Sequence, residues 1–174
     1  MVDGSYGNEA GSAAPEPAGG RSEEPGAALR GGGRIVVGVD GSPTSRQALA
    51  WAVEEAGYRH ASLDAVAAWQ VPVDFAMLPA GEGIGDAAVQ METDVKAELA
   101  DALSEVEGSG LTITETVVEG PAAPVLIERS KGAEMLVVGS RGRGGFVGLL
   151  LGSVSSQCVH HAHCPVVVVH GEED

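Results

Sequence analysis

Five short apolar runs, separated by segments with helical patterning, constrain the fold of this chain more than any other feature. The runs are rich in Val, Ile, Ala and Thr and lie at residues 34–40, 62–69, 111–118, 134–139 and 165–170. Between them apolar residues recur at intervals of three and four, as Leu49, Ala52, Val53 and Ala56 do. Strands that alternate with helices form parallel sheets with helices on both faces, so we expect an α/β fold.

The boundaries of the helices follow from capping residues, prolines and glycines. Ser42 suits an N-cap and Pro43 a first helical residue, and the first helix is expected to fade near residues 57–60. Further helices are expected at 86–107, from Gly120-Pro121 to about Ser130 with Pro124 in the first turn, and at 153–163. Residues 71–85 hold two prolines and three glycines and are expected to form a loop. The pattern alone leaves the order of the strands open.

Length and composition favour one domain behind an N-terminal tail. The chain has 174 residues, of which 44% are hydrophobic and only 3% aromatic, so its core must consist of aliphatic side chains. Residues 1–33 carry few bulky apolar side chains and cannot offset the entropy of ordering, which predicts a disordered tail. The foldable domain is therefore expected to span residues 34–171.

The charge of the chain limits its partners. A formal net charge of -15 argues against nucleic acid and anionic membranes as partners through bulk electrostatics. No apolar run approaches the ~20 residues of a transmembrane helix. The first residues also lack the basic start and apolar core of a secretory signal. We therefore expect a cytoplasmic protein without nucleic-acid or membrane partners.

A glycine-rich loop after the fourth run carries the strongest functional signal. Gly139, Gly142 and Gly152 follow the spacing G-x2-G-x9-G, with Ser153 directly after them. A P-loop would need Lys after its last glycine, and a dinucleotide fingerprint would need glycine in place of Val147. Glycines let backbone N–H groups approach an anion, and a helix start at Ser153 would add unpaired N–H groups. The alternative is a flexible surface loop without a ligand.

This spacing resembles that of the ATP-binding branch of the universal stress protein family. Residues 35–42, 69–72, 135–140 and 164–169 resemble further segments of the family, so that the resemblance covers about residues 34–170. It implies a five-stranded parallel sheet of order 3-2-1-4-5, with ATP in the crevice at the carboxyl ends of the strands. It also implies a homodimer and a nucleotide-dependent regulator in the stress response, with slow or no ATP hydrolysis.

The resemblance assigns a set of residues to the nucleotide site: Gly38, Asp40, Ala68, Gly139, Ser140, Arg141, Gly142, Arg143, Gly144, Gly145, Gly152, Ser153 and Val154. It places Gly38 and Asp40 against the nucleoside and ribose, with Asp40 also near a divalent metal such as Mg2+, and Ala68 against adenine. Residues 139–145 would surround the ribose and phosphates, and residues 152–154 would bind phosphate oxygens. Alternatives remain, since Asp40 also suits a helix start and the two arginines also suit open surface.

Three functions from different classes fit these features. The first is an ATP-binding regulator that is at most a weak ATPase, and the second is an ATP-dependent enzyme that adenylates or phosphorylates a substrate. An enzyme would need a positioned base or nucleophile, and the glycine loop contains no His, Lys or Cys. The third is a dimeric scaffold without a ligand, which the intact glycine spacing disfavours.

Two features near the C-terminus complete the analysis. Cys158 and Cys164 flank three histidines, but a C-x5-C spacing matches no common zinc pattern. Ordinary residues of a helix that leads into a strand are therefore favoured over a metal site or a disulfide. In the order 3-2-1-4-5 the apolar run 166–169 is an edge strand, which predicts a two-fold dimer through this strand.

Overall fold

The five apolar runs form one parallel sheet in the computed structural model, which describes residues 1, 32–72, 84–144 and 150–171. The strands are β1 (Arg34–Gly38), β2 (Ser62–Trp69), β3 (Ile113–Glu119), β4 (Met135–Gly139) and β5 (Val166–Val169). They pair in the order β3-β2-β1-β4-β5, and each neighbouring pair is parallel. The predicted fold class and the strand order implied by the resemblance are therefore confirmed.

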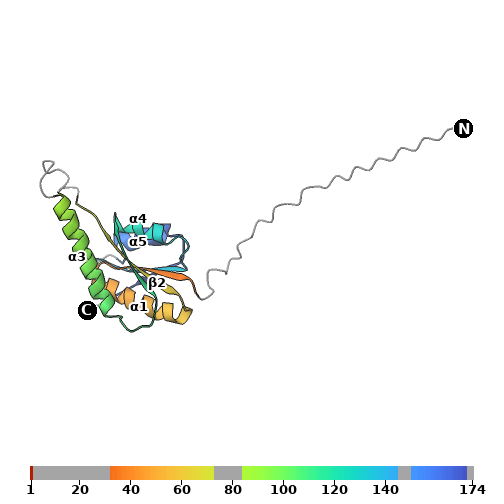
Figure 1. Ribbon diagram of the computed structural model, residues 1–174, viewed down its shortest axis with the longest axis horizontal. Helices are drawn as coiled ribbons and strands as arrows, with labels where there is room; N and C mark the ends of the chain where they lie inside the picture. The colour runs from red at the N-terminus through yellow and green to blue at the C-terminus, as the bar shows by residue number, and fades with distance from the viewer. Residues whose placement is uncertain (2–31, 73–83, 145–149, 172–174) are drawn as a thin grey trace.

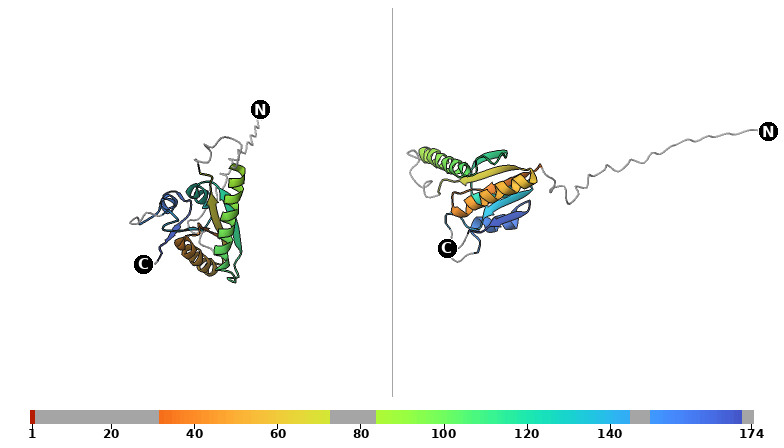
Figure 2. Two further views of the ribbon diagram at one scale, coloured as in Figure 1. Left: turned by 90° about the vertical axis from the view of Figure 1, so that its left-hand side faces the viewer. Right: turned by 90° about the horizontal axis from the view of Figure 1, so that it is seen from below.

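Helices cover both faces of this sheet. They are α1 (Pro43–Arg59), α3 (Ile84–Ser104), α4 (Ala122–Arg129) and α5 (Ser153–His161). Figure 1 shows α4 and α5 together on one side of the sheet, and α1 on the other side. The further views show α1 and α3 as the pair that covers this second side (Figure 2). The chain therefore leaves β1 towards one face, through α1, and β4 towards the other, through α5.

The turn between β1 and α1 forms as the sequence predicts. Ser42 is the N-cap of α1 and accepts a hydrogen bond of 3.3 Å from the N–H group of Ser45, while Pro43 is the first helical residue. The helix ends at Arg59, and His60 takes the left-handed conformation with a φ of 55°. The buried side of α1 is mainly small and apolar: Ser45, Ala48, Leu49, Ala52 and Ala56. Such small residues let α1 pack closely onto the sheet.

The hydrophobic core has two layers, one on each face of the sheet. In β1, Ile35 and Val37 belong to the layer under α1 and α3, whereas Val36 belongs to the layer under α4 and α5. Burial on both faces explains the continuous apolar sequence of this strand. By contrast, residues 166–169 of β5 are only half-buried, because β5 lies at the edge of the sheet.

The observed ends of several elements differ from the expected ones. The helix expected at 86–107 spans Ile84–Ser104, because a turn closed by the N–H of Val106 and the carbonyl of Leu103 follows it. The strand expected at 111–118 spans Ile113–Glu119, in register with Leu63 to Trp69 of β2. Pro124 lies in the first turn of α4, as predicted. Most of the expected tail at 1–33 and of the expected loop at 71–85 lies outside the described residues.

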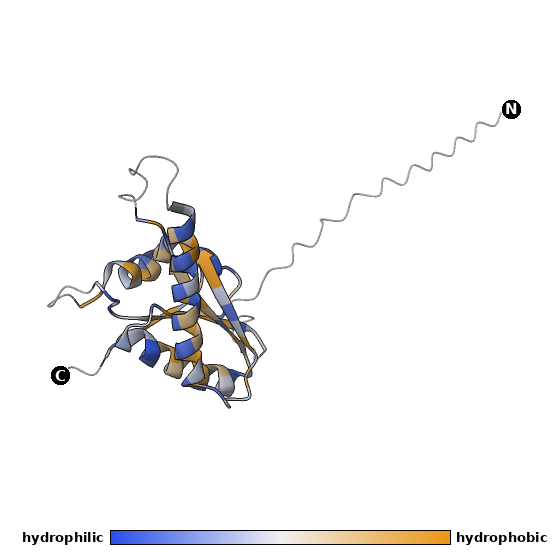
Figure 3. Cartoon of the chain, turned by 60° about the vertical axis from the view of Figure 1, so that its left-hand side comes forward, coloured by the Kyte–Doolittle hydropathy of each residue, from blue (hydrophilic) through white to orange (hydrophobic). Residues whose placement is uncertain are grey.

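The longest helix, α3, has a polar outer side. Figure 3 shows hydrophilic residues recurring along this side, while Leu99, Ala102 and Leu103 are buried against the sheet. Within the described ranges, no helix is long and apolar enough to cross a membrane.

Candidate functional site

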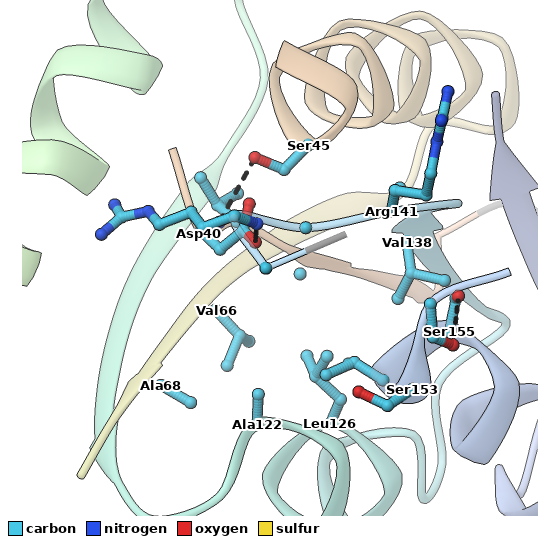
Figure 4. Close-up of a pocket in the computed structure, with 18 residues that line it drawn as sticks. Asp40, Ser45, Val66, Ala68, Ala122, Leu126, Val138, Arg141, Ser153 and Ser155 are labelled. Carbon is cyan, nitrogen blue, oxygen red and sulfur yellow. Dashed lines mark hydrogen bonds between the residues drawn. The ribbon is translucent and has the colours of Figure 1, made fainter. Parts of the chain in front are cut away.

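A cavity of about 600 Å³ opens at the carboxyl ends of β1 and β4, within the range of ~300–1,000 Å³ that is usual for small-molecule sites. The helices that follow these two neighbouring strands lie on opposite faces of the sheet, and ligands bind at such switch points in open α/β sheets. Figure 4 shows the lining side chains, which come from the ends of three strands, the starts of α1, α4 and α5 and the glycine loop. The fold therefore creates a cleft where the sequence predicts a ligand.

Most of the predicted site residues line this cavity: Gly38, Asp40, Ala68, Gly139, Arg141, Gly142, Arg143, Gly144, Gly152, Ser153 and Val154. Ser140 does not line it and is only 1% exposed. Its carbonyl oxygen accepts hydrogen bonds from the Gly152 N–H (2.7 Å) and the Ser155 hydroxyl (2.9 Å). Ser140 therefore holds the start of α5 in place but does not face the cavity. Packing of the start of α5 against the end of β4 causes this burial. Gly145 lies outside the described residues.

Asp40 is held in place by the turn that it begins. Its Oδ1 accepts hydrogen bonds from the Ser42 N–H (3.0 Å) and the Ser42 hydroxyl (2.6 Å), and its Oδ2 accepts one from the Arg143 N–H (3.3 Å). Partial burial raises the pKa of the Asp40 carboxyl, but these hydrogen bonds outweigh it and hold the pKa below the usual 3.8. Asp40 thus presents an ionised, oriented carboxylate to the cavity while it also shapes the turn before α1.

The glycines of the loop are needed for different reasons. A Cβ on Gly139 would lie 3.0 Å from the backbone carbonyl carbon of Thr44, so this glycine lets β4 end tightly against α1. A Cβ on Gly142 would lie 2.5 Å from Oδ2 of Asp40. At Gly152 the nearest atom would be a carbonyl oxygen at 3.4 Å, which is an ordinary contact. Of these three glycines, Gly152 is the one at which the protein itself tolerates a side chain.

The floor of the cavity is apolar, and sequence reasoning missed most of it. It consists of Val66 from β2, Val138 from β4, and Ala122 and Leu126 from α4 (Figure 4). A Cβ on Gly38 would come 2.9 Å from Cδ1 of Leu126, so this glycine lets α4 approach the end of β1. The signal in the sequence was the position of Ala122, which follows the carboxyl end of β3 after only Gly120 and Pro121. Such a floor suits a flat, uncharged ring.

The start of α5 forms a second, polar part of the cavity. Gly152 is the N-cap and has no side chain to bond the first helical N–H groups. These groups belong to Ser153, Val154 and Ser155, and they have no partner within the helix. All three residues line the cavity. The unpaired N–H groups and the positive end of the helix dipole favour an anion here.

The side chains of the two loop arginines do not point towards the cavity floor. The Arg141 side chain extends away from Leu126 and Ala122 on the cavity floor (Figure 4). The guanidinium group of Arg143 forms an ion pair with Glu98 of α3. Contact of either arginine with a phosphate therefore stays a prediction, and Glu98 is a neighbour of the site that sequence reasoning missed.

Metal-ligating residues do not cluster within the described ranges, which contain no group of three or more His, Cys, Asp or Glu side chains suited to a metal ion. A metal at Asp40 stays a prediction, and it would have to draw further ligands from a bound nucleotide or water. Cys158 and Cys164 are free thiols. Burial raises the pKa of Cys158 to about 11, which keeps this thiol protonated and unreactive.

Comparison with known proteins agrees with this geometry. The sequence matches the universal stress protein family over residues 33–170. It is 39% identical to Universal stress protein Rv2623 of Mycobacterium tuberculosis over 153 residues, which cover 80% of this chain and 48% of that protein. The chain thus spans about half the length of the curated relatives that it matches.

Solved structures agree with the fold. Universal stress protein UspA from Lactobacillus plantarum superimposes with a TM-score of 0.66 at 21% identity, over 80% of this chain and 98% of that one. A universal stress protein in complex with cAMP superimposes with a TM-score of 0.58 at 29% identity, over 79% of this chain and 96% of that one.

Proposed function

This chain belongs to the universal stress protein family, and we propose that it binds an adenine nucleotide, ATP, in the cavity at the carboxyl ends of β1 and β4. The similar structure that holds cAMP supports this proposal. The observation that carries it is the convergence on one cavity of an ionised carboxylate, an apolar floor and an uncapped helix start. In this proposal nucleotide occupancy regulates the protein within a cytoplasmic stress response.

The three parts of the cavity suit the three parts of a nucleotide. The apolar floor around Val66 and Leu126 suits the base, which gains from leaving water. The carboxylate of Asp40 suits the ribose hydroxyls, which donate to an ionised acceptor in strong hydrogen bonds. The N–H groups at the start of α5 suit phosphate oxygens. The proposed site thus uses backbone groups for the anion and one charged side chain for the sugar.

Mg2+ is compatible with this arrangement as a companion of the phosphates. The ion favours one or two carboxylates together with phosphate oxygens and water. The Oδ2 atom of Asp40 accepts one hydrogen bond, of 3.3 Å, and so retains a lone pair for a metal. When bound, the ion would neutralise phosphate charge, and Asp40 would be its ligand from the described residues.

Regulation fits the lining residues better than fast catalysis does. Among the described residues of the cavity wall there is no His, Lys or Cys that could act as a base or nucleophile. We therefore propose slow or no ATP hydrolysis. The alternative function, an ATP-dependent enzyme, predicts rapid formation of ADP or AMP once a substrate is supplied.

Nucleotide retention provides the direct test. Native mass spectrometry of the freshly purified chain is expected to detect bound ATP, and calorimetry with added ATP is expected to show saturable binding. Gly152→Val is expected to fold normally and to lose binding, because Gly152 lines the cavity and a Cβ there meets only ordinary contacts in the protein.

A glycine outside the cavity serves as the control for this test. A Cβ on Gly57 of α1 would meet open space, so Gly57→Val should bind ATP as the wild type does. Wild-type affinity in Gly152→Val would show that ATP binds elsewhere. An empty wild-type protein that also fails to bind added ATP would refute the proposed function.

We also propose a homodimer through β5. This strand is a sheet edge with an apolar sequence, and its valines are only half-buried in the single chain. Exposed apolar edges favour pairing with another chain, and a two-fold axis would let β5 meet its own copy. Val167→Lys combined with Val169→Lys should shift the protein towards the monomer in light scattering. A wild type that is already monomeric at tens of micromolar would refute the dimer.

A further inference from the structure

The ion pair between Arg143 and Glu98 joins the glycine loop to α3 beside the cavity. We propose that Glu98 is a positioning residue that lowers the preference of the site for nucleotides with many phosphates, because it holds the guanidinium group of Arg143 away from them. This inference rests on the proposed function, since it concerns how the same site distinguishes its ligands.

Arg143 is fixed at both ends. Its backbone N–H donates to Oδ2 of Asp40, and its guanidinium group pairs with Oε2 of Glu98. Between these anchors the side chain passes over Gly41, where a Cβ would lie 2.7 Å from Nη2 of Arg143. Gly41 has a φ of 76°, a conformation that glycine adopts without strain. The bare backbone at Gly41 therefore leaves a path for the arginine towards α3.

The direction of Arg143 is away from the expected phosphate position. A second, smaller cavity of about 140 Å³ adjoins the main one, and both are lined by Arg143 and Asp40. Glu98 lines only the smaller cavity, whereas residues 152–154 at the start of α5 line only the main one. The ion pair thus holds the guanidinium group on the side opposite the helix start.

The ion pair is weak enough for a phosphate chain to compete with it. The side chains of Arg143 and Glu98 are 53% and 41% exposed, and pairs at such exposure contribute little to stability because water screens them. An arginine that reaches a phosphate gains charge-assisted, bidentate hydrogen bonds. A nucleotide with several phosphates can therefore recruit Arg143, but it must first displace Glu98. Adenosine, which has no phosphate, has no such competition to overcome.

Two acidic residues at the end of α3 provide a matched control, since Asp101 lies in its last turn and Glu105 directly after it. Asp101 and Glu105 both pair with Arg46 of α1, which lines neither cavity. Glu105→Gln removes one negative charge and one ion pair directly after the end of α3, whereas Glu98→Gln removes them within the helix. Because Glu105→Gln does not alter the ion pair of Arg143, it distinguishes the effect of a lost negative charge from the effect of releasing Arg143.

The experiment compares the affinities for ATP and adenosine by calorimetry in the full chain. We expect Glu98→Gln to bind ATP about three- to five-fold more tightly than the wild type, the change that follows from loss of one exposed ion pair. The affinity for adenosine should not change. Glu105→Gln should leave the ratio of the two affinities as it is in the wild type. In the Arg143→Gln background, Glu98→Gln should have no further effect on ATP.

The inference would be overturned by equal changes for ATP and adenosine, by an equal gain in Glu105→Gln, or by a gain that persists without Arg143. Unaltered ATP affinity in Glu98→Gln would overturn it as well. If the wild type binds neither ligand, the proposed function itself is refuted. Normal wild-type binding without an ATP-selective gain refutes the role of Glu98 alone.

Discussion

Two aspartates near opposite ends of the same sheet have different surroundings. Asp64, near the amino end of β2, has a side chain that is only 4% exposed. It accepts hydrogen bonds from Nη1 of Arg34 (2.9 Å) and from the hydroxyl of Thr116 (2.7 Å). Asp40, just beyond the carboxyl end of β1, is exposed and borders the large cavity.

The two ends also differ in what their polar groups bind. At the amino end, Arg34 donates to Asp64 and also to the backbone carbonyls of Arg129 (3.0 Å) and Lys131 (3.1 Å), which ties β1 to the end of α4. At the carboxyl end, the turn orients Asp40 but leaves it facing open space. Polar groups that are hydrogen-bonded to other parts of the protein contribute to its stability. Oriented polar groups that border a cavity are instead available to a ligand.

Asp64→Ala should produce the largest effect, and the effect should be on stability. The substitution leaves the buried hydroxyl of Thr116 without its acceptor and removes the partner of Arg34. We expect the free energy of unfolding to fall by roughly 2–4 kcal/mol, between the loss of one buried hydrogen bond and that of a buried ion pair. Urea denaturation measures this as a lower midpoint at an unchanged slope. A midpoint equal to that of the wild type would contradict the structural role of Asp64.

Asp40→Ala should instead affect binding. Loss of charge-assisted hydrogen bonds to the ribose is expected to weaken ATP binding by about 10- to 150-fold, or ~1.5–3 kcal/mol, measured by calorimetry. The urea midpoint should change much less than in Asp64→Ala, since Asp40 is exposed. An unchanged dissociation constant would leave Asp40 as an acid that only shapes the turn before α1.

The smallest expected effect is a pH dependence of stability that comes from Asp40. Its pKa is lower in the folded chain than the usual 3.8, so the stabilisation is present above that value and disappears as the pH falls through the folded pKa. The difference in urea midpoint between the wild type and Asp40→Asn should therefore be larger at about pH 6 than at about pH 3. A difference that grows on acidification would mean that burial, and not hydrogen bonding, dominates this carboxyl.

The positions of the strands and helices, and the glycine loop of the site, could be predicted from the sequence alone. Strand positions follow from local apolar patterning, and the start of α1 follows from Ser42 and Pro43, because these signals act over a few residues. The spacing of the loop glycines likewise indicates where backbone can approach an anion. The order of the strands needed the family resemblance, because alternating elements alone do not specify which strands become neighbours.

The contacts between these parts could be seen only in the folded chain. Glu98 pairs with an arginine 45 residues away, Leu126 reaches the floor beside Gly38, and Ser140 is buried behind the loop that contains it. The same holds for Gly139, where a Cβ would lie 3.0 Å from the backbone of α1 and crowd it. Such contacts join segments that are distant in the chain, so they depend on how helices pack across the sheet and leave no periodic signal in the sequence.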